Sequence, residues 1–142
     1  MQISTILAKK GSTVYTVTPD QTVREAVALL VDKRIGAVVV VDDTGRPMGI
    51  VSERDVVREL AKNENVLNEP IGRIMTSDVI IAHSGDDTKA VSKTMTVKRF
   101  RHLPVMDHDE LIGIVSIGDV VKQRLMDYER EQEAMRDYIA TA

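Results

Sequence analysis

The stretch Gly49-Ile50-Val51-Ser52-Glu53-Arg54-Asp55-Val56-Val57 is repeated 64 residues later as Gly113-Ile114-Val115-Ser116-Ile117-Gly118-Asp119-Val120-Val121. In each copy an apolar run leads into a helix-like stretch, with a Ser and an Asp three residues apart at the junction. Self-similarity at a fixed period is typical of a duplicated structural unit. The repeat therefore predicts two equivalent units related by a pseudo-twofold axis, each with the same polar pair.

The residues around the first copy predict a β-α-β-β-α unit. Strands are expected at 14–18, 37–41 and 48–51, and the second is so uniformly apolar that both its faces should be buried. Thr22 and Glu25 have the spacing of a capping box, which predicts a helix from Thr22 to about residue 34. Ser52 should cap a second helix, to about residue 62, whose inward-facing residues are Val56, Val57 and Leu60.

The second half predicts the same order. Strands are expected at 79–82, 103–106 and 111–115, and helices at 88–100 and from Ser116 onward. Even the segments that precede the two halves correspond, because 3–7 resembles 71–75. The sequence thus predicts a mixed α/β (α+β) fold of two tandem β-α-β-β-α motifs, at 2–62 and 71–126. A linker at 63–70 joins them, and a C-terminal helical extension follows at 127–142.

The last helix is expected to continue past its counterpart. Its apolar residues alternate at spacings of four and three across a very polar stretch: Val121, Leu125, Tyr128, Met135 and Ile139, with Gln132 in the same series. This is the narrow seam of a coiled coil. Two interpretations stay open, an amphipathic helix lying on its own domain and a helix that associates with a second copy or a partner.

Composition excludes several classes of protein. The net charge of −3 and the 3% of aromatic residues argue against nucleic-acid binding, which needs basic and stacking surfaces. There is no Cys, and the three His residues lack metal-ligand spacing, so thiol catalysis and zinc sites are not expected. No apolar run approaches the length that spans a bilayer, and no signal-peptide pattern is present, which predicts a soluble cytoplasmic protein.

These motifs carry a family resemblance. Each half resembles a cystathionine-β-synthase (CBS) motif, and the pair resembles a Bateman module, through the two Gly-Ile-Val-Ser-x-x-Asp junctions and the stretch Arg101-His102-Leu103-Pro104-Val105. The resemblance implies two clefts able to hold adenosyl ligands such as AMP, ATP, NAD(H) or S-adenosylmethionine. It also implies a homodimer that regulates a partner protein, as yet unidentified. The first copy departs from the pattern, with Val39-Val40 and Gly36-Ala37 at the matched positions, so the two clefts should differ in chemistry.

The junction residues suit a nucleotide. Asp55 and Asp119 can each accept both hydroxyls of a ribose, and Ser52 and Ser116 can bind a ribose or phosphate oxygen. The helices that begin here offer unpaired N–H groups to a phosphate. Ser-x-x-Asp is also a capping-box variant, so a purely structural role, alone or beside ligand binding, stays open.

Other candidates flank the junctions. Arg54 can reach a phosphate, or can be a solvated helix-start residue. Arg101 and His102 precede a strand, where His102 can contact phosphate and tune binding near neutral pH, or can be a structural surface residue. Aliphatic strands around the junctions, with Val79, Leu103 and Pro104, can enclose an adenine, and Pro104 can mark a strand edge facing the cleft.

Gly36, at the position matching Arg101, is interpreted as the end of a helix, although it can also let a ligand approach the backbone. The resemblance, together with these residues, implies a non-catalytic regulatory or sensor module for AMP, ATP or NADH. The alternative is a nucleotide-independent interaction and dimerisation scaffold.

Overall fold

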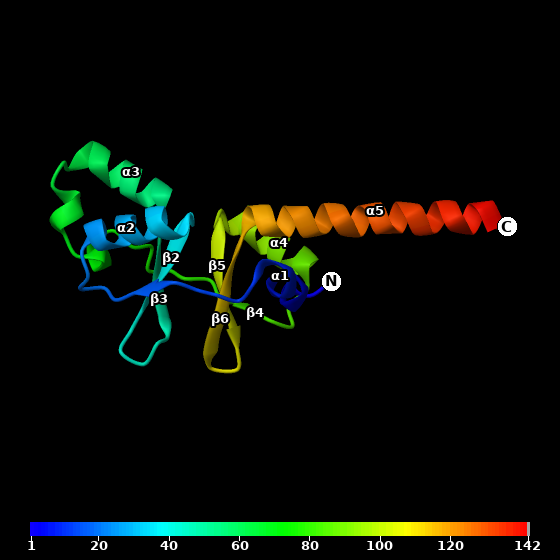
Figure 1. Cartoon of the computed structure of the whole chain (residues 1–142), viewed down its shortest axis with the longest axis horizontal. Coiled ribbons are helices and arrows are strands. Elements are labelled where there is room, and N and C mark those ends of the chain that lie inside the picture. The colour runs from blue at the N-terminus through cyan, green and yellow to red at the C-terminus, as the bar shows by residue number, and fades with distance from the viewer. Residues whose placement is uncertain (142) are drawn as a thin grey trace.

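Two three-stranded sheets pack face to face, with helices on the outer side of each (Figure 1). The computed structural model describes residues 1–141 of the chain. The first sheet has the order β1-β2-β3 and the second β4-β5-β6, and in both the first pair is parallel and the second antiparallel. This arrangement confirms the predicted mixed fold of two β-α-β-β-α units.

The first unit contains β1 (Thr16–Val17), α2 (Val23–Lys33), β2 (Ala37–Val41), β3 (Pro47–Ser52) and α3 (Glu53–Lys62). The second contains β4 (Ala82–His83), α4 (Thr88–Lys98), β5 (His102–Asp107), β6 (Glu110–Ser116) and α5 (Ile117–Thr141). A helix, α1 (Ile3–Lys10), precedes the first unit, and the short 3-10 turns η1 (Val66–Asn68) and η2 (Ile71–Arg73) precede the second.

Strand β2 is buried along its whole length, as its uniform apolar sequence predicted. Successive side chains of a strand point to opposite faces. Val38 and Val40 accordingly pack in the core beneath α2, whereas Val39 and Val41 belong to neither helix-side core although both are buried. The central strands are therefore covered by helices on one face and by the other sheet on the second.

The first strand of the second sheet is shorter than predicted. The structure places it at Ala82–His83, and Val79 lies outside it. In the first unit the Val39 N–H donates to the Tyr15 carbonyl at 3.4 Å. The matched residue in the second unit is Pro104, which has no N–H to continue the ladder.

Three further predictions on the helices need correction. Val57 and Leu60 do not face inward, with exposed fractions of 67% and 39%, and of the three residues only Val56 is buried. Only half of the capping box at Thr22 forms: its hydroxyl accepts from the Glu25 N–H at 3.2 Å, while the Glu25 carboxylate accepts from Gln21.

Gly36 does not end its helix. Arg34 and Arg99 end α2 and α4 instead, at left-handed φ angles of 54° and 60°, and the second helix stops two residues before its predicted end at Phe100 for this reason. A left-handed residue at a helix end satisfies the last carbonyls, and here the N–H of Arg34 bonds the carbonyl of Val31 at 3.3 Å.

The segments that precede the two units are exchanged between them. Ile3, Ile6 and Leu7 of α1 pack in the core of the second unit, whereas Ile71 and Ile74 pack in the core of the first. The hydrogen bonds are exchanged in the same way: the Ile3 N–H donates to the Asp86 carbonyl at 2.9 Å, and the Ile71 N–H donates to the Gln21 carbonyl at 2.8 Å. Each core is therefore completed by residues from outside its own repeat.

This exchange explains the glycine that opens each repeated stretch. A Cβ atom on Gly113 would lie 2.8 Å from Cδ2 of Leu7, and one on Gly49 would lie 2.5 Å from Sδ of Met75. Leu7 and Met75 occupy matched positions in the two exchanged segments. The two glycines thus give room for the same contact, made twice.

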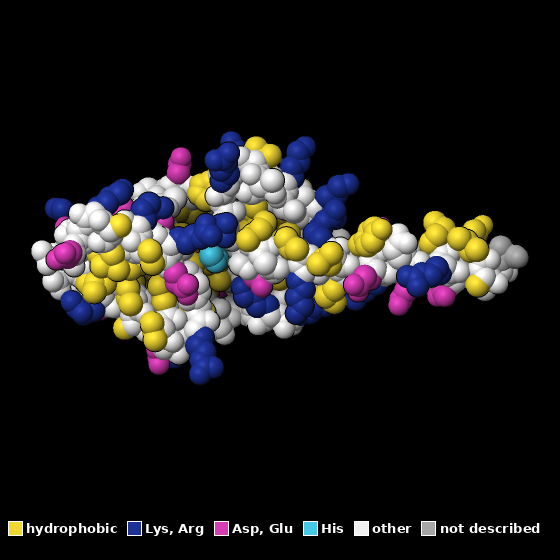
Figure 2. Space-filling view, turned by 90° about the horizontal axis from the view of Figure 1, so that it is seen from above, with side chains coloured by type: hydrophobic (Ala, Val, Ile, Leu, Met, Phe, Trp, Pro, Cys, Tyr) yellow, Lys and Arg dark blue, Asp and Glu magenta, His cyan; other side chains and the backbone are white. Residues whose placement is uncertain are grey.

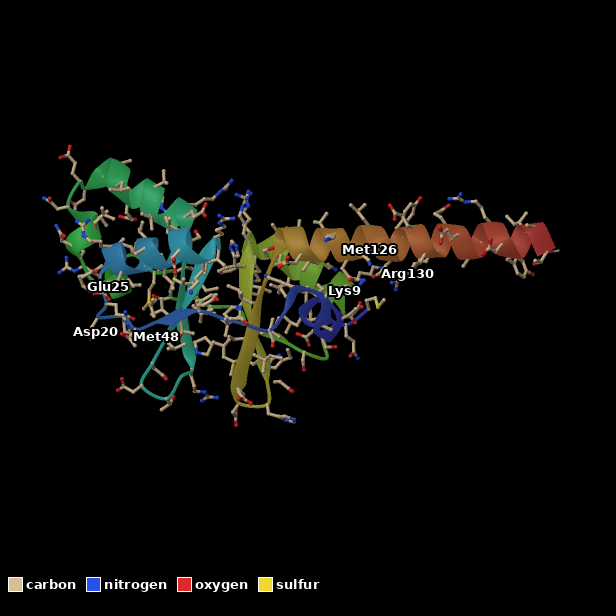
Figure 3. The ribbon with its side chains drawn as sticks, viewed as in Figure 1. Lys9, Asp20, Glu25, Met48, Met126 and Arg130 are labelled. Atoms are coloured by element: carbon tan, nitrogen blue, oxygen red, sulfur yellow. The ribbon has the colours of Figure 1, made fainter. Side chains whose placement is uncertain are left out.

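Helix α5 runs on past the body of the molecule to residue 141 (Figure 1). Figure 3 shows where it leaves the body, with Lys9 of α1 beneath Met126 and with Arg130 already beyond α1. Within residues 1–141, no helix combines the length and the apolar character that crossing a membrane requires.

Candidate ligand-binding clefts

The first Ser-Asp pair forms a complete capping box at the start of α3. The Asp55 N–H donates to Oγ of Ser52 at 3.3 Å, and the Ser52 N–H donates to Oδ2 of Asp55 at 2.8 Å. The other carboxylate oxygen of Asp55 accepts from Nη2 of Arg58 at 2.7 Å. Asp55 is buried, with 7% of its surface exposed, so its charge is balanced by donors on both oxygens.

The second pair repeats the capping contacts at the start of α5. The Asp119 N–H donates to Oγ of Ser116 at 3.1 Å, and the Ser116 N–H donates to Oδ2 of Asp119 at 2.9 Å. The cation beside this carboxylate is different, because Nζ of Lys10 lies 2.6 Å from the same Oδ2. Within residues 1–141 no donor reaches Oδ1 of Asp119, so this oxygen can accept from a ligand.

Charge and burial act in opposite directions on Asp119. Burial raises the pKa of this carboxyl, but the Lys10 ammonium and the Ser116 N–H together hold the pKa below its ordinary value. Lys10 also donates to the Ile114 carbonyl at 3.0 Å. The exchanged helix α1 therefore supplies the counter-ion of the second junction.

The first cleft lies where the first junction meets the second unit. It has a volume of about 290 Å³. Its polar wall combines Ser52 and Asp55 with four guanidinium groups, and its apolar wall comes from strand β3, residues 79–80 and the end of α4. The lining residues are Ile50, Ser52, Arg54, Asp55, Arg58, Thr76, Val79, Ile80, Arg99, Phe100, Arg101 and His102. One carboxylate thus faces four cations, and Figure 2 shows basic side chains gathered where the two units meet.

The second cleft is its pseudo-symmetric counterpart, with a volume of about 260 Å³. Ile114 and Ser116 replace Ile50 and Ser52, while Arg34 and Ile35 stand at the positions of Arg99 and Phe100. Gly36 and Ala37 stand where the first cleft has Arg101 and His102. Asp119 lines an adjoining cavity, which shares Lys10 with the second cleft. The second cleft is therefore built on the same plan with fewer cations.

His102 lies between the two clefts and lines both of them. Its ring passes over Gly36, where a Cβ atom would lie 3.6 Å from Nε2. Burial lowers the pKa of His102, and the nearby Lys10 charge lowers it further, against the opposing pull of Asp119 and Asp55. The imidazole is thus held toward its neutral form, in reach of the charges of both junctions.

The structure brings most of the predicted site residues together. Six of them line the first cleft: Ser52, Arg54, Asp55, Val79, Arg101 and His102. Ser116 lines the second cleft and Asp119 adjoins it. Leu103 and Pro104 line neither cleft: both are buried on β5, and Leu103 packs in the core of the second unit.

Several lining residues were not singled out in the sequence. Arg58 has a local signal, because it lies three residues after Asp55 on the same helix face. Lys10 and Thr76 have none, since they reach the clefts only through the exchanged segments. Residues 1–141 contain no group of three or more His, Asp or Glu side chains arranged to hold a metal ion.

Comparison with known proteins identifies the family to which this architecture belongs. The family model of the CBS domain matches residues 11–62 and 71–125. The crystal structure of the CBS-domain containing protein ATU1752 from Agrobacterium tumefaciens is 40% identical and superposes with a TM-score of 0.82, over 87% of this chain and 99% of that one.

Two similar structures hold small molecules. The CBS domain protein PAE2072 from Pyrobaculum aerophilum, solved in complex with AMP, is 28% identical with a TM-score of 0.75, over 84% of this chain and 89% of that one. The CBS domain pair of protein MJ0100, solved with 5′-methylthioadenosine and S-adenosyl-L-methionine, is 27% identical with a TM-score of 0.77, over 91% and 98%.

The relatives differ in length. The chain spans 39% and 32% of two curated relatives that it matches, and 68% and 71% of two others. The family model nevertheless covers both repeats, each with its junction and its cleft. This chain belongs to the CBS domain family, as a pair of CBS motifs.

Proposed function

We propose that the chain is a non-catalytic sensor that binds an adenosine nucleotide, with the first cleft as its principal site. The observation that carries the proposal is the pairing, in that cleft, of one carboxylate at a helix start with four arginines and an aliphatic wall. An adenosine nucleotide has three matching parts, namely an apolar base, a ribose diol and an anionic phosphate.

The arginines favour a phosphate. Arg54, Arg99 and Arg101 line the cleft, and none of the three has an ion-pair partner within residues 1–141. Guanidinium groups bind phosphate through paired hydrogen bonds, and the start of α3 adds its own positive dipole end. A ligand with several phosphates, such as ATP or NADH, can engage more of these arginines than AMP can.

The junction carboxylates favour a ribose. A carboxylate that keeps one oxygen in its capping box can still offer the other to a hydroxyl. Asp119 has such an oxygen, and Asp55 gains one when the exposed Arg58 side chain turns away from it. The AMP complex of PAE2072 and the adenosyl complexes of MJ0100 support the same class of ligand for this chain.

Sensing would follow from a difference in the affinity of the nucleotide for different arrangements of the two units. The nucleotide touches residues of both units, so it favours whichever arrangement of the two units it binds more tightly. We expect a cytoplasmic homodimer whose arrangement is read by a regulated partner protein. The bound nucleotide undergoes no reaction in this scheme.

A ligand panel tests the proposal. AMP, ATP, NADH and S-adenosylmethionine are compared by thermal shift, where a ligand at 100 times its Kd should stabilise the protein by about 2.7 kcal/mol. Isothermal titration then compares Asp55→Asn and Arg101→Gln with the wild type. Loss of a charge-assisted hydrogen bond, worth about 1.5–3 kcal/mol, should weaken binding roughly 10- to 100-fold in each variant.

Matched variants complete the design. Asp119→Asn makes the same change in the second cleft, and Arg130→Gln removes an arginine from the part of α5 beyond α1. We expect Arg130→Gln to leave the affinity unchanged, and Asp119→Asn to affect only a second binding event. A flat thermal response to all four ligands would refute the proposal and favour the interaction scaffold.

A further inference from the structure

The second half of α5 exposes an apolar stripe to solvent. Past the body, the exposed fractions are 60% for Tyr128, 58% for Met135 and 66% for Ile139, and nearer the body they are 46% for Val121 and 59% for Leu125. Figure 2 shows hydrophobic side chains along the part of the helix that extends beyond the body. Buried α5 contacts are made on another side, where Gln123 packs against α1 and accepts from Lys9 at 3.2 Å.

This arrangement decides one question that the sequence left open. The seam does not lie on its own domain, because all of its apolar members are exposed. An isolated helix of about 15 residues is only marginally stable in water. The spacing of four and three residues is that of a helix that winds around another helix, with Leu125, Gln132 and Ile139 at a positions and Val121, Tyr128 and Met135 at d positions.

The charges beside the seam favour a second copy that runs parallel with full overlap of the two seams. The charged residues at the flanking e and g positions are Lys122, Arg124, Glu129, Glu131 and Arg136, and Tyr138 occupies the last g position. In a parallel pair of α5 helices, a g residue meets the e residue five positions later on the partner. Arg124 then meets the partner's Glu129, and Glu131 meets the partner's Arg136, so every such pair is attractive.

In an antiparallel pair with the same overlap, the pairs of charged residues are repulsive. Glu129 would face the partner's Glu129, Glu131 would face the partner's Glu131, and Lys122 would face the partner's Arg136. Within residues 1–141 none of these five side chains forms an ion pair in its own chain. They are therefore available to a second copy, and when the two seams overlap fully their contacts are attractive in the parallel direction.

We propose that α5 pairs with α5 of a second copy of this chain as a parallel, in-register coiled coil. Gln132 supports a single register, because one polar residue at an a position is stable only opposite its own equivalent. The twofold axis then runs along α5 and sets both bodies at the same end of the coil. This inference does not depend on nucleotide binding.

Engineered cysteines test the direction, since the chain has no Cys of its own. In the parallel pair Met135 lies opposite the partner's Met135, so Met135→Cys should form a disulfide dimer under mild oxidation. In the antiparallel pair with the same overlap the two Met135 residues are ten residues out of register, about 15 Å along the helix, and cannot be bridged. Asp137→Cys, on the outer face of the same turn, is the matched control and should stay monomeric on a non-reducing gel.

A charge exchange tests the same contact without cysteines. Glu131→Lys places a lysine opposite the partner's Arg136 and should raise the dimer Kd roughly tenfold in sedimentation velocity, because two attractive pairs become repulsive. The double variant Glu131→Lys/Arg136→Glu reverses both charges and should restore the wild-type Kd. An unlinked Met135→Cys protein, whether monomeric or dimeric, would overturn the proposal, as would a Kd unaffected by Glu131→Lys.

Discussion

Substituting Gly113 by Ala should loosen α1 from the second unit. The added Cβ would lie 2.8 Å from Cδ2 and 3.3 Å from Cδ1 of Leu7. Carbon atoms pack best at about 3.5–4.0 Å, so Leu7 has to recede by about 1 Å. Leu7 is buried, with 6% of its surface exposed, and has little free space to enter. Overpacking of this kind costs about 1–3 kcal/mol.

The backbone changes the free energy of unfolding in the opposite direction. Gly113 does not have a positive φ angle, so Ala can adopt its conformation and gains about 0.5–1 kcal/mol over Gly within a strand. The net loss in the free energy of unfolding should be about 0.5–2 kcal/mol, measured by equilibrium urea denaturation. Gly85→Ala is the control, because a Cβ there meets nothing within 4 Å.

A double-mutant cycle isolates the contact. Leu7→Ala alone should cost about 2–5 kcal/mol, as for other buried leucines. In the Leu7→Ala background the extra Cβ no longer meets a side chain, so Gly113→Ala should cost nothing or stabilise slightly. An equal cost in both backgrounds would refute the steric explanation of this glycine.

Substitutions of Gly113 and Gly49 by Ala should each affect a different cleft. Displacing Leu7 moves α1 and with it Lys10, which lines the second cleft, whereas Gly49→Ala displaces Met75 beside Thr76, which lines the first. Gly49→Ala should therefore weaken nucleotide binding in the first cleft, and Gly113→Ala should leave that cleft unchanged in isothermal titration.

Two further predictions concern buried polar groups. The Thr88 hydroxyl is fully buried and has no hydrogen-bond partner within residues 1–141, and the matched residue in the first unit is the buried Val23. Thr88→Val should therefore raise the free energy of unfolding by about 1 kcal/mol, measured by urea denaturation. A loss of stability would contradict this explanation. Burial and the Lys10 charge lower the pKa of His102 from 6.5, so below that pH the unfolded chain binds more protons than the folded protein. The contribution of His102 to stability should therefore be complete above pH 6.5 and fall as the pH drops toward the lowered pKa. His102→Gln should remove that slope from a series of unfolding curves between pH 5 and 7, while His108→Gln on the exposed hairpin should retain it, and an unchanged slope in His102→Gln would count against the shared position of this residue.

The element order was predictable because its signals are local. The uniform apolar run at Ala37–Val41 and the Ser cap before α3 are each contained within a few residues, and both are confirmed. The helix ends at Arg34 and Arg99 were harder, because arginine has no preference for a left-handed φ angle and Gly36 stands nearby as a more obvious candidate.

The clefts could be predicted only in part, because each is built from both repeats. The junction residues Ser52 and Asp55 were identified from their own spacing, but Arg99 and Phe100 reach the same cleft across the interface between the units. Nothing local predicts that interface. The contact between Gly113 and Leu7 is similarly hidden, since more than one hundred residues separate the two along the chain.

The exchange of the segments also has a consequence for synthesis of the protein. A ribosome releases α1 well before its docking site, which includes Asp86 and the β6 residue Gly113. The first core has a much shorter delay, because only the short segment with η1 separates α3 from Ile71 and Ile74. The first unit can therefore close while the chain is still growing, with α1 left undocked and its apolar face exposed until the second unit emerges. Helix α1 is thus made before the residues on which it docks.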